Sequence, residues 1–179
     1  MSLQKLLESL PEYAKDMKLN LSSLLNQPEL TPAQAWGTLV AAAVASRNVE
    51  VTEAVFTEAE QHLSPEQMRG AKAAATVMGM NNVFYRFLHL TDNPKYETMP
   101  ARLRMNIIRT HGADPLDFEL WCTAVSAINN CPTCVSSHEK VVREKGMSEE
   151  TVLASVRIAA VVHAIATVLE AESVVPASN

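Results

Sequence analysis

The sequence predicts an all-α fold, and three observations lead to this class. Only five glycines occur in 179 residues, and Phe, Trp and Tyr together make up 5% of the chain. Ala, Leu, Val, Met and Glu instead fill long blocks with helical periodicity. No Asn-Gly or Asp-Gly hairpin dipeptide is present. With 47% apolar residues the chain has the composition of one compact helical domain, which we expect to span residues 1–179.

Two helix starts in the N-terminal half are visible as capping patterns. Thr31-Pro32-Ala33-Gln34 and Ser64-Pro65-Glu66-Gln67 each place a hydroxyl cap before a proline and a glutamine at the third helical position. Each pattern opens a block with helical periodicity. The helices expected in this half cover residues 2–10, 11–18, 32–46, 50–61 and 65–89.

The C-terminal half begins after a group of helix-breaking residues. Asp92-Asn93-Pro94 and His111–Pro115 flank a short predicted helix and divide the domain into two halves. A faint similarity between Trp36–Asn48 and Trp121–Asn130 is the basis for expecting that the halves are related. Wide apolar arcs on the long helices favour packing into an oligomer. The helices expected here cover residues 96–108, 115–129, 132–145 and 149–172.

Charge and apolar patterning exclude several classes of protein. The net charge of −5 comes from 20 acids and 15 bases without a long run of either sign, so no nucleic-acid partner is expected. The N-terminus lacks the pattern of a signal peptide, and the longest apolar stretches look too short and too often interrupted by polar residues to cross a bilayer. We therefore expect a cytoplasmic protein that does not associate with a membrane.

The three cysteines are Cys122, Cys131 and Cys134, and the last two form a C-x-x-C motif. In a reducing compartment this spacing indicates redox chemistry or a metal site. Pro132 suits the first position of a helix, which makes Cys131 the predicted N-cap and Cys134 the third helical residue. Unpaired backbone N–H groups and the helix dipole stabilise a thiolate there, so the thiols are expected to react near neutral pH.

His138 lies one helical turn after Cys134 and is expected on the same face of the helix. It can accept the proton of the Cys134 thiol, or pair with the thiolate as an imidazolium. This local base favours Cys134 as the residue that attacks peroxide. Cys131 is the competing candidate, because a sulfur at the tip of the helix should be the more accessible one.

Three other groups complete the candidate site. Glu119, twelve positions before Cys131, lies near the start of the preceding helix and is expected to orient His138 or relay its proton. Cys122 is expected to be a buried, inert thiol. His111 lies near the end of an element and is expected to be exposed, as are His62 and His89.

A family resemblance rests on four of these residues. Glu119, Cys131, Cys134 and His138 reproduce the E-x11-C-x-x-C-x3-H pattern of the AhpD-like alkyl hydroperoxidases, which have the carboxymuconolactone decarboxylase-like fold. Further similar stretches extend the resemblance over almost the whole chain: Leu10–Asp16, Trp36–Leu39, Met78–Arg86 and Leu103–Ile108.

The resemblance implies an all-helical homotrimer with lipoyl-dependent peroxidase activity. Members of this family also reduce the peroxiredoxin AhpC, with electrons from dihydrolipoyl groups on a 2-oxoacid dehydrogenase component. Carried over by position, Cys134 is the peroxidatic residue that becomes a sulfenic acid, and Cys131 is the proton donor and resolving thiol. Glu119 and His138 form the proton relay. No bound cofactor or metal is implied, and Thr133 departs from relatives that have a histidine at its position.

Two alternative functions remain open from the residues. A zinc-binding helical interaction module could use Cys131, Cys134 and His138, with Cys122 or Glu119 as the fourth ligand. Zinc sites usually draw their ligands from two separated pairs, which this sequence lacks. A decarboxylase of the related family is the second alternative, although that reaction has no need for a C-x-x-C motif.

Overall fold

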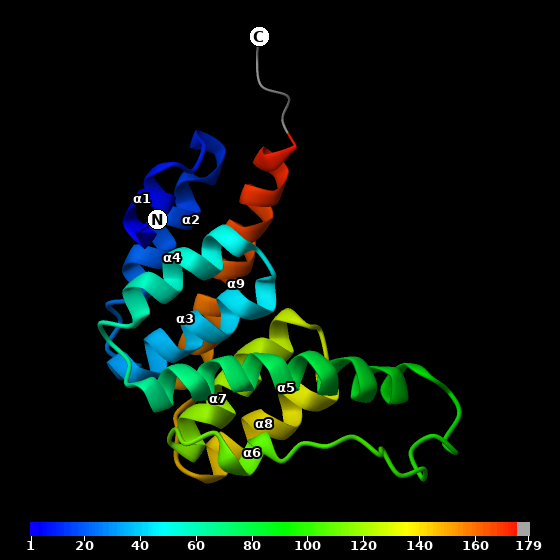
Figure 1. Cartoon of the computed structure of the whole chain (residues 1–179). Coiled ribbons are helices and arrows are strands. Elements are labelled where there is room, and N and C mark those ends of the chain that lie inside the picture. The colour runs from blue at the N-terminus through cyan, green and yellow to red at the C-terminus, as the bar shows by residue number, and fades with distance from the viewer. Residues whose placement is uncertain (175–179) are drawn as a thin grey trace.

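The computed structural model describes residues 1–174, and within that range the chain folds into helices without any strand (Figure 1). A short 3-10 helix, Glu12–Ala14, precedes α2. The α-helices are α1 (Leu3–Glu8), α2 (Lys15–Leu24), α3 (Pro32–Ser46), α4 (Val49–Ala59), α5 (Pro65–Leu90), α6 (Ile107–Thr110), α7 (Pro115–Ile128), α8 (Pro132–Glu144) and α9 (Glu149–Ser173). The predicted all-α class is confirmed.

The centre of the fold is formed by α3 and α7, which contact each other and both contact α5 and α9. At one end α1 packs on α4 and α2 packs on α9, while α8 packs on α7 and α5 at the other end (Figure 1). One apolar cluster connects these layers from Leu3 to Ala166. The helix that carries the C-x-x-C motif therefore packs against α7 of the centre and against α5.

Trp121 of α7 is fully buried where α7 meets α3 and α5. Its indole N–H donates to the Gln34 carbonyl oxygen at 3.3 Å. Two glycines make room for the ring. A Cβ atom at Gly37 would overlap the indole, and one at Gly70 would lie 3.2 Å from it. Close contact of the three helices thus depends on small residues that face one large one.

Both predicted capping patterns are confirmed. Thr31 and Gln34 form a reciprocal capping box at the start of α3, and Ser64 and Gln67 form the same arrangement at the start of α5. A proline occupies the first turn in each case. These local hydrogen bonds satisfy backbone N–H groups that have no partner within the helix.

Two predicted helices differ from the structure. The helix expected at 11–18 lies at Lys15–Leu24, after the 3-10 turn. The helix expected at 96–108 is absent except for α6 at its end. Pro100 interrupts that segment because it lacks a backbone N–H and disfavours helical geometry in the preceding residue. Residues 91–106 instead form an extended arm that leaves the end of α5 and returns to α6 (Figure 1).

The expectation that no stretch is long and apolar enough to cross a bilayer is wrong for α9. Among the described residues, this helix alone satisfies the length and composition of a membrane span. More than half of its apolar stretch is buried inside the fold, where it packs against α3 and α7. Its apolar character is accounted for by this position in the core.

Candidate functional site: a disulfide at the start of α8

The turn between α7 and α8 sets the position of the first cysteine. Asn130 adopts a left-handed backbone conformation with φ of 53°. Its N–H donates to the Ala127 carbonyl, and the N–H of Cys131 donates to the Ser126 carbonyl, both at 3.1 Å. This pair of hydrogen bonds is the Schellman motif that ends many helices. Cys131 follows directly as the N-cap of α8, as predicted.

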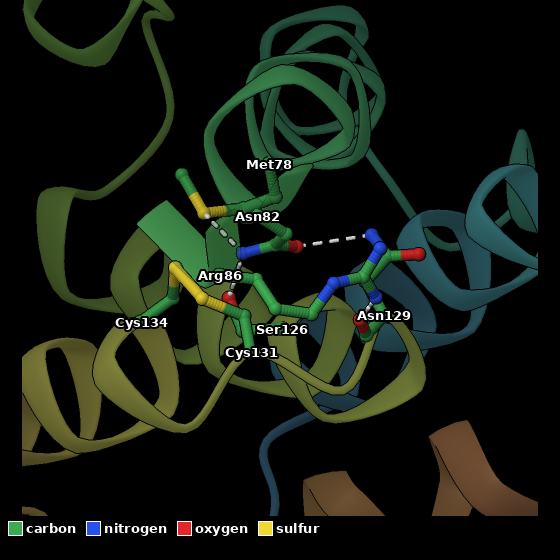
Figure 2. Close-up of a disulfide and its surroundings, with 7 residues drawn as sticks. All are labelled: Met78, Asn82, Arg86, Ser126, Asn129, Cys131 and Cys134. Atoms are coloured by element: carbon green, nitrogen blue, oxygen red, sulfur yellow. Dashed lines mark hydrogen bonds between the residues drawn. A yellow bond between two sulfur atoms is a disulfide. The ribbon is translucent and has the colours of Figure 1, made fainter. Parts of the chain in front are cut away.

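Cys131 and Cys134 are joined in a disulfide across the first turn of α8 (Figure 2). Their Cα atoms are 5.3 Å apart, within the ordinary range for such a bond. Cys131 is 0% exposed and Cys134 is 5% exposed. The expectation that Cys131 would be the more accessible sulfur is therefore wrong, because the turn and the helices around it cover the tip of α8.

His138 and Glu119 are brought together from α8 and α7. His138 Nδ1 lies 2.6 Å from Glu119 Oε2, and both side chains are largely shielded from solvent. A carboxylate accepts the hydrogen bond, so the Nδ1–H tautomer leaves Nε2 with a free lone pair. The predicted pairing of the two residues is confirmed. In this disulfide form, no hydrogen bond between His138 and either sulfur occurs in the part of the chain that the structure describes.

A polar network that the sequence did not reveal holds the turn against α5 (Figure 2). Asn82 is 1% exposed, and its Nδ2 donates to Ser126 Oγ at 2.9 Å. Its Oδ1 accepts from Asn129 Nδ2, also at 2.9 Å. The amide of Asn82 therefore contacts both the last turn of α7 and the residue that caps it.

Arg86 adds a second connection to the same turn. Its guanidinium donates to the Asn129 carbonyl oxygen at 2.6 Å, which satisfies one of the unpaired carbonyls at the end of α7. Met78, Asn82 and Arg86 recur every four residues and so share one face of α5. An amide and a guanidinium at this spacing on one face of α5 were the signal that could have identified the network.

Comparison with known proteins agrees with this architecture. The chain is 60% identical over 173 residues to a protein of Solibacter usitatus named alkyl hydroperoxide reductase AhpD, covering 97% of this chain and 98% of that one. A protein of the same name from Acidobacterium capsulatum is 59% identical, with 97% and 96% covered. A third, from Gluconacetobacter diazotrophicus, is 58% identical, with 95% and 93% covered.

The chain belongs to the AhpD family. The model of the carboxymuconolactone decarboxylase family also matches, over residues 94–175. This match includes α6 to α8 and with them the disulfide, Glu119 and His138. The N-terminal half, which supplies Asn82 and Arg86, lies outside the decarboxylase-family match and is covered by the AhpD relatives.

Cys122 and Thr133 of this AhpD-family chain differ in exposure. Cys122 is a free, fully buried thiol, and burial raises its pKa well above the ordinary value, with a smaller contribution from the charge of Glu119. Its predicted burial is confirmed. Thr133, between the two cysteines, is exposed and makes no side-chain hydrogen bond within the described part of the chain.

His111 departs from the prediction. It is only 5% exposed, and its ring stacks on Phe118 with the ring centres 3.9 Å apart. Nδ1 accepts the backbone N–H of Ala113 at 3.1 Å, so the ring proton is on Nε2. Burial lowers the pKa of His111 and favours the neutral ring.

The ligand set considered for zinc is not assembled in this form of the AhpD-family chain. The two sulfurs are bonded to each other, and His138 is directed to Glu119. Across residues 1–174, no group of three or more His, Cys, Asp or Glu side chains has an arrangement that could hold a metal ion.

Proposed function

We propose that the chain is a cytoplasmic thiol peroxidase that reduces alkyl hydroperoxides through Cys131 and Cys134. The observation that carries this proposal is the disulfide at the N-terminus of α8, one helical turn from a His138–Glu119 pair. The name of the relatives, alkyl hydroperoxide reductase, supports the reaction class.

In the first step, the Cys134 thiolate attacks the distal oxygen of ROOH. The S–O bond forms as the O–O bond breaks, and the alkoxide takes a proton from Cys131 to leave as ROH. Cys134 is oxidised to a sulfenic acid. Its position at the third residue of α8 stabilises the thiolate, and the free Nε2 of His138 accepts the thiol proton, with Glu119 holding the imidazolium that results.

In the second step, the Cys131 thiolate attacks the sulfur of the sulfenic acid. The S–S bond forms, and the hydroxyl leaves as water after it takes a proton from the relay. The short separation of the two Cα atoms lets this bond close within the first turn of α8.

In the third step, a dihydrolipoyl dithiol reduces the disulfide. One of its thiolates attacks a sulfur of the pair, a mixed disulfide forms, and its second thiol releases cyclic lipoyl disulfide and the two cysteine thiols. Cys134 is the residue of the pair that is partly exposed, which favours it as the point of attack. None of the three steps requires a metal, haem or flavin.

The same thiol exchange gives the chain two protein partners in this proposal. The dihydrolipoyl group is carried by a 2-oxoacid dehydrogenase component, and the reduced Cys131–Cys134 pair passes electrons to the disulfide of the peroxiredoxin AhpC. The gene-family name of the relatives supports a role beside that peroxiredoxin.

Assembly into a homotrimer is the last part of the proposal. Large apolar side chains are exposed on the last turns of α5 and on the arm, where Phe87 and Tyr96 pack edge to face. Exposed apolar surface of this kind favours contact with another subunit. The residues are Val83, Phe87, Leu90, Tyr96 and Met99.

The test of the activity is dihydrolipoamide-dependent peroxide consumption by the wild type, Cys131→Ser and Cys134→Ser. Both variants should lose turnover. Cys131→Ser should still complete one oxidation and accumulate a sulfenic acid on Cys134 that dimedone labels, whereas Cys134→Ser should not react with dimedone. Wild-type turnover in both variants would refute the mechanism.

The two alternatives predict different results with the same proteins. A zinc module would contain stoichiometric metal and thiols that resist titration. A decarboxylase would release CO2 from a lactone carboxylate at the same rate in the wild type and in Cys131→Ser.

A further inference from the structure

A cavity of about 390 Å³ lies between the α6–α7 segment and α8. Ile108 and Leu116 form part of its wall on one side, and Val141 of α8 forms part of the other. The exposed Lys145 also lines it, one turn of α8 beyond Val141. Most of the lining is carbon, which suits an apolar ligand.

Glu119 connects this cavity to the relay. Its side chain lines the cavity, and Oε2 of the same carboxylate is 2.6 Å from His138 Nδ1. Val141 of the cavity wall also lies on the same face of α8 as His138 and Cys134. The three residues share this face because they are separated by four and three positions. From Cys134 to Val141 the helix advances about 10 Å at 1.5 Å per residue.

Two aromatic rings line the cavity beside Glu119. Phe118 and His111 both line the cavity and stack on each other. The neutral form of His111 is fixed by the hydrogen bond that Nδ1 accepts from Ala113. This neutral aromatic pair offers good contact to a hydrocarbon chain. The charged side chains that also line the cavity are Asp114, Glu119 and Lys145.

We propose that this cavity binds the alkyl chain of the hydroperoxide, with the oxygen end directed along α8 toward Glu119, His138 and Cys134. The inference rests on the proposed peroxidase function and adds to it a subsite that selects for chain length. A chain that reaches from Cys134 to Val141 must contain several carbons, so hydrogen peroxide and the shortest alkyl hydroperoxides gain nothing from the cavity.

The kinetic test uses Val141→Trp, which places an indole in the cavity from a partly exposed position on α8. The KM for an octyl hydroperoxide should rise about tenfold or more, since contacts of two or more carbons are lost. The kcat/KM for hydrogen peroxide should stay at the wild-type value. The matched control is Thr76→Trp, which fills a different cavity of about 500 Å³ beside α5 and should change neither value. An equal loss for both peroxides in Val141→Trp, or no loss for either, would overturn the subsite.

A binding measurement separates the subsite from the reaction. The disulfide form of the full chain is titrated with 1-octanol, the alcohol product, and binding is followed by NMR shifts of residues around Leu116 and Val141. We expect saturable binding in the wild type and Thr76→Trp, and its loss in Val141→Trp. Absence of binding in the wild type, or equal binding in Val141→Trp, would refute the subsite. If the wild type binds octanol in this manner but consumes no peroxide, the proposed reaction fails while the alkyl-binding cavity stands.

Discussion

The imidazole of His138 and the carboxylate of Glu119 lie 2.6 Å apart at Nδ1 and Oε2, although the two residues are nineteen positions apart in the chain. Two consecutive helices joined by a tight turn bring them together. The carboxylate fixes the orientation of the ring, so Nε2 points away from Glu119. This contact holds the imidazole in one orientation on the face of α8 that carries Cys134.

Removing either member of the pair should slow oxidation of Cys134 more than it harms folding. Glu119→Gln and His138→Phe should each reduce the rate of the thiol step by roughly 10²–10⁴-fold. Stopped-flow mixing of the reduced protein with one equivalent of peroxide measures this step. Glu139→Gln is the matched control, because Glu139 pairs with Arg143 on the same helix. Oxidation of Cys134 at the wild-type rate in both relay variants would show that Glu119 and His138 take no part in the thiol step.

Asn82 should be far more important for stability than its neighbour Asn81. Asn82→Ala leaves Ser126 and Asn129 without their buried partner and should lower the free energy of unfolding by about 1–3 kcal/mol. The amide proton of Cys131 should also exchange faster, because the turn is released from α5. Asn81 is buried as well, but its Oδ1 has no hydrogen-bond partner within the described residues, so Asn81→Ala should cost much less. Urea unfolding and hydrogen exchange measure both effects, and equal losses in the two variants would contradict the role of the network.

The contact between Gly37 and Trp121 gives a clear prediction for stability. Gly37→Ala should destabilise the fold by about 1–3 kcal/mol, because the new methyl group overlaps the buried indole. Gly79→Ala serves as the control. A Cβ there meets no atom within 4 Å, so the alanine should stabilise α5 by about 0.5–1 kcal/mol. Thermal unfolding of the two variants should shift in opposite directions.

The buried thiol of Cys122 should remain protonated over the working range of pH. Since burial raises its pKa in the folded state, the unfolded chain loses this proton first as the pH rises. The contribution to stability is therefore complete below the ordinary thiol pKa and is lost as the pH rises from there through the folded value. Cys122→Ala should remove that alkaline decline. In the reduced wild type at pH 8, mass spectrometry after iodoacetamide treatment should find Cys134 modified and Cys122 intact until denaturant is added.

The apolar end of α5 and the arm should control assembly. Leu90→Arg changes a side chain that is 74% exposed and should convert the proposed trimer to smaller species without loss of helical signal. Analytical ultracentrifugation measures the change. Leu153→Arg is the control, because Leu153 is also an exposed leucine but lies on α9. A wild-type chain that sediments as a monomer at high concentration would end this part of the proposal.

Local rules predicted most of the fold because the chain obeys them where helices begin. The hydroxyl, proline and glutamine of each capping box act within four residues, so their effect is visible in sequence. The arm was missed because the apolar residues around Pro100 have helical spacing, and one missing N–H decides the outcome. The apolar stretch of α9 is longer than expected. Because α3 and α7 bury this helix, it can be apolar over more of its length than a surface helix.

The site shows the same division between local and distant effects. Cys131 at the N-cap and Glu119 beside His138 follow from one helix, one turn and the next helix. The network from Asn82 and Arg86 could not be derived in that way, because it joins residues more than forty positions apart. The burial of Cys131 was missed for the same reason, as it depends on side chains from α5 that the local sequence does not contain.

The left-handed Asn130 lets a loop of only three residues, 129–131, join α7 to α8. One consequence concerns tolerance to insertion and deletion. An extra residue between Ile128 and Pro132 would break the two hydrogen bonds that close this turn and would displace α8 relative to α7, which separates His138 from Glu119. The arm at residues 91–106 has no comparable restriction, so natural variation in chain length should accumulate there and be absent from the junction of the two helices.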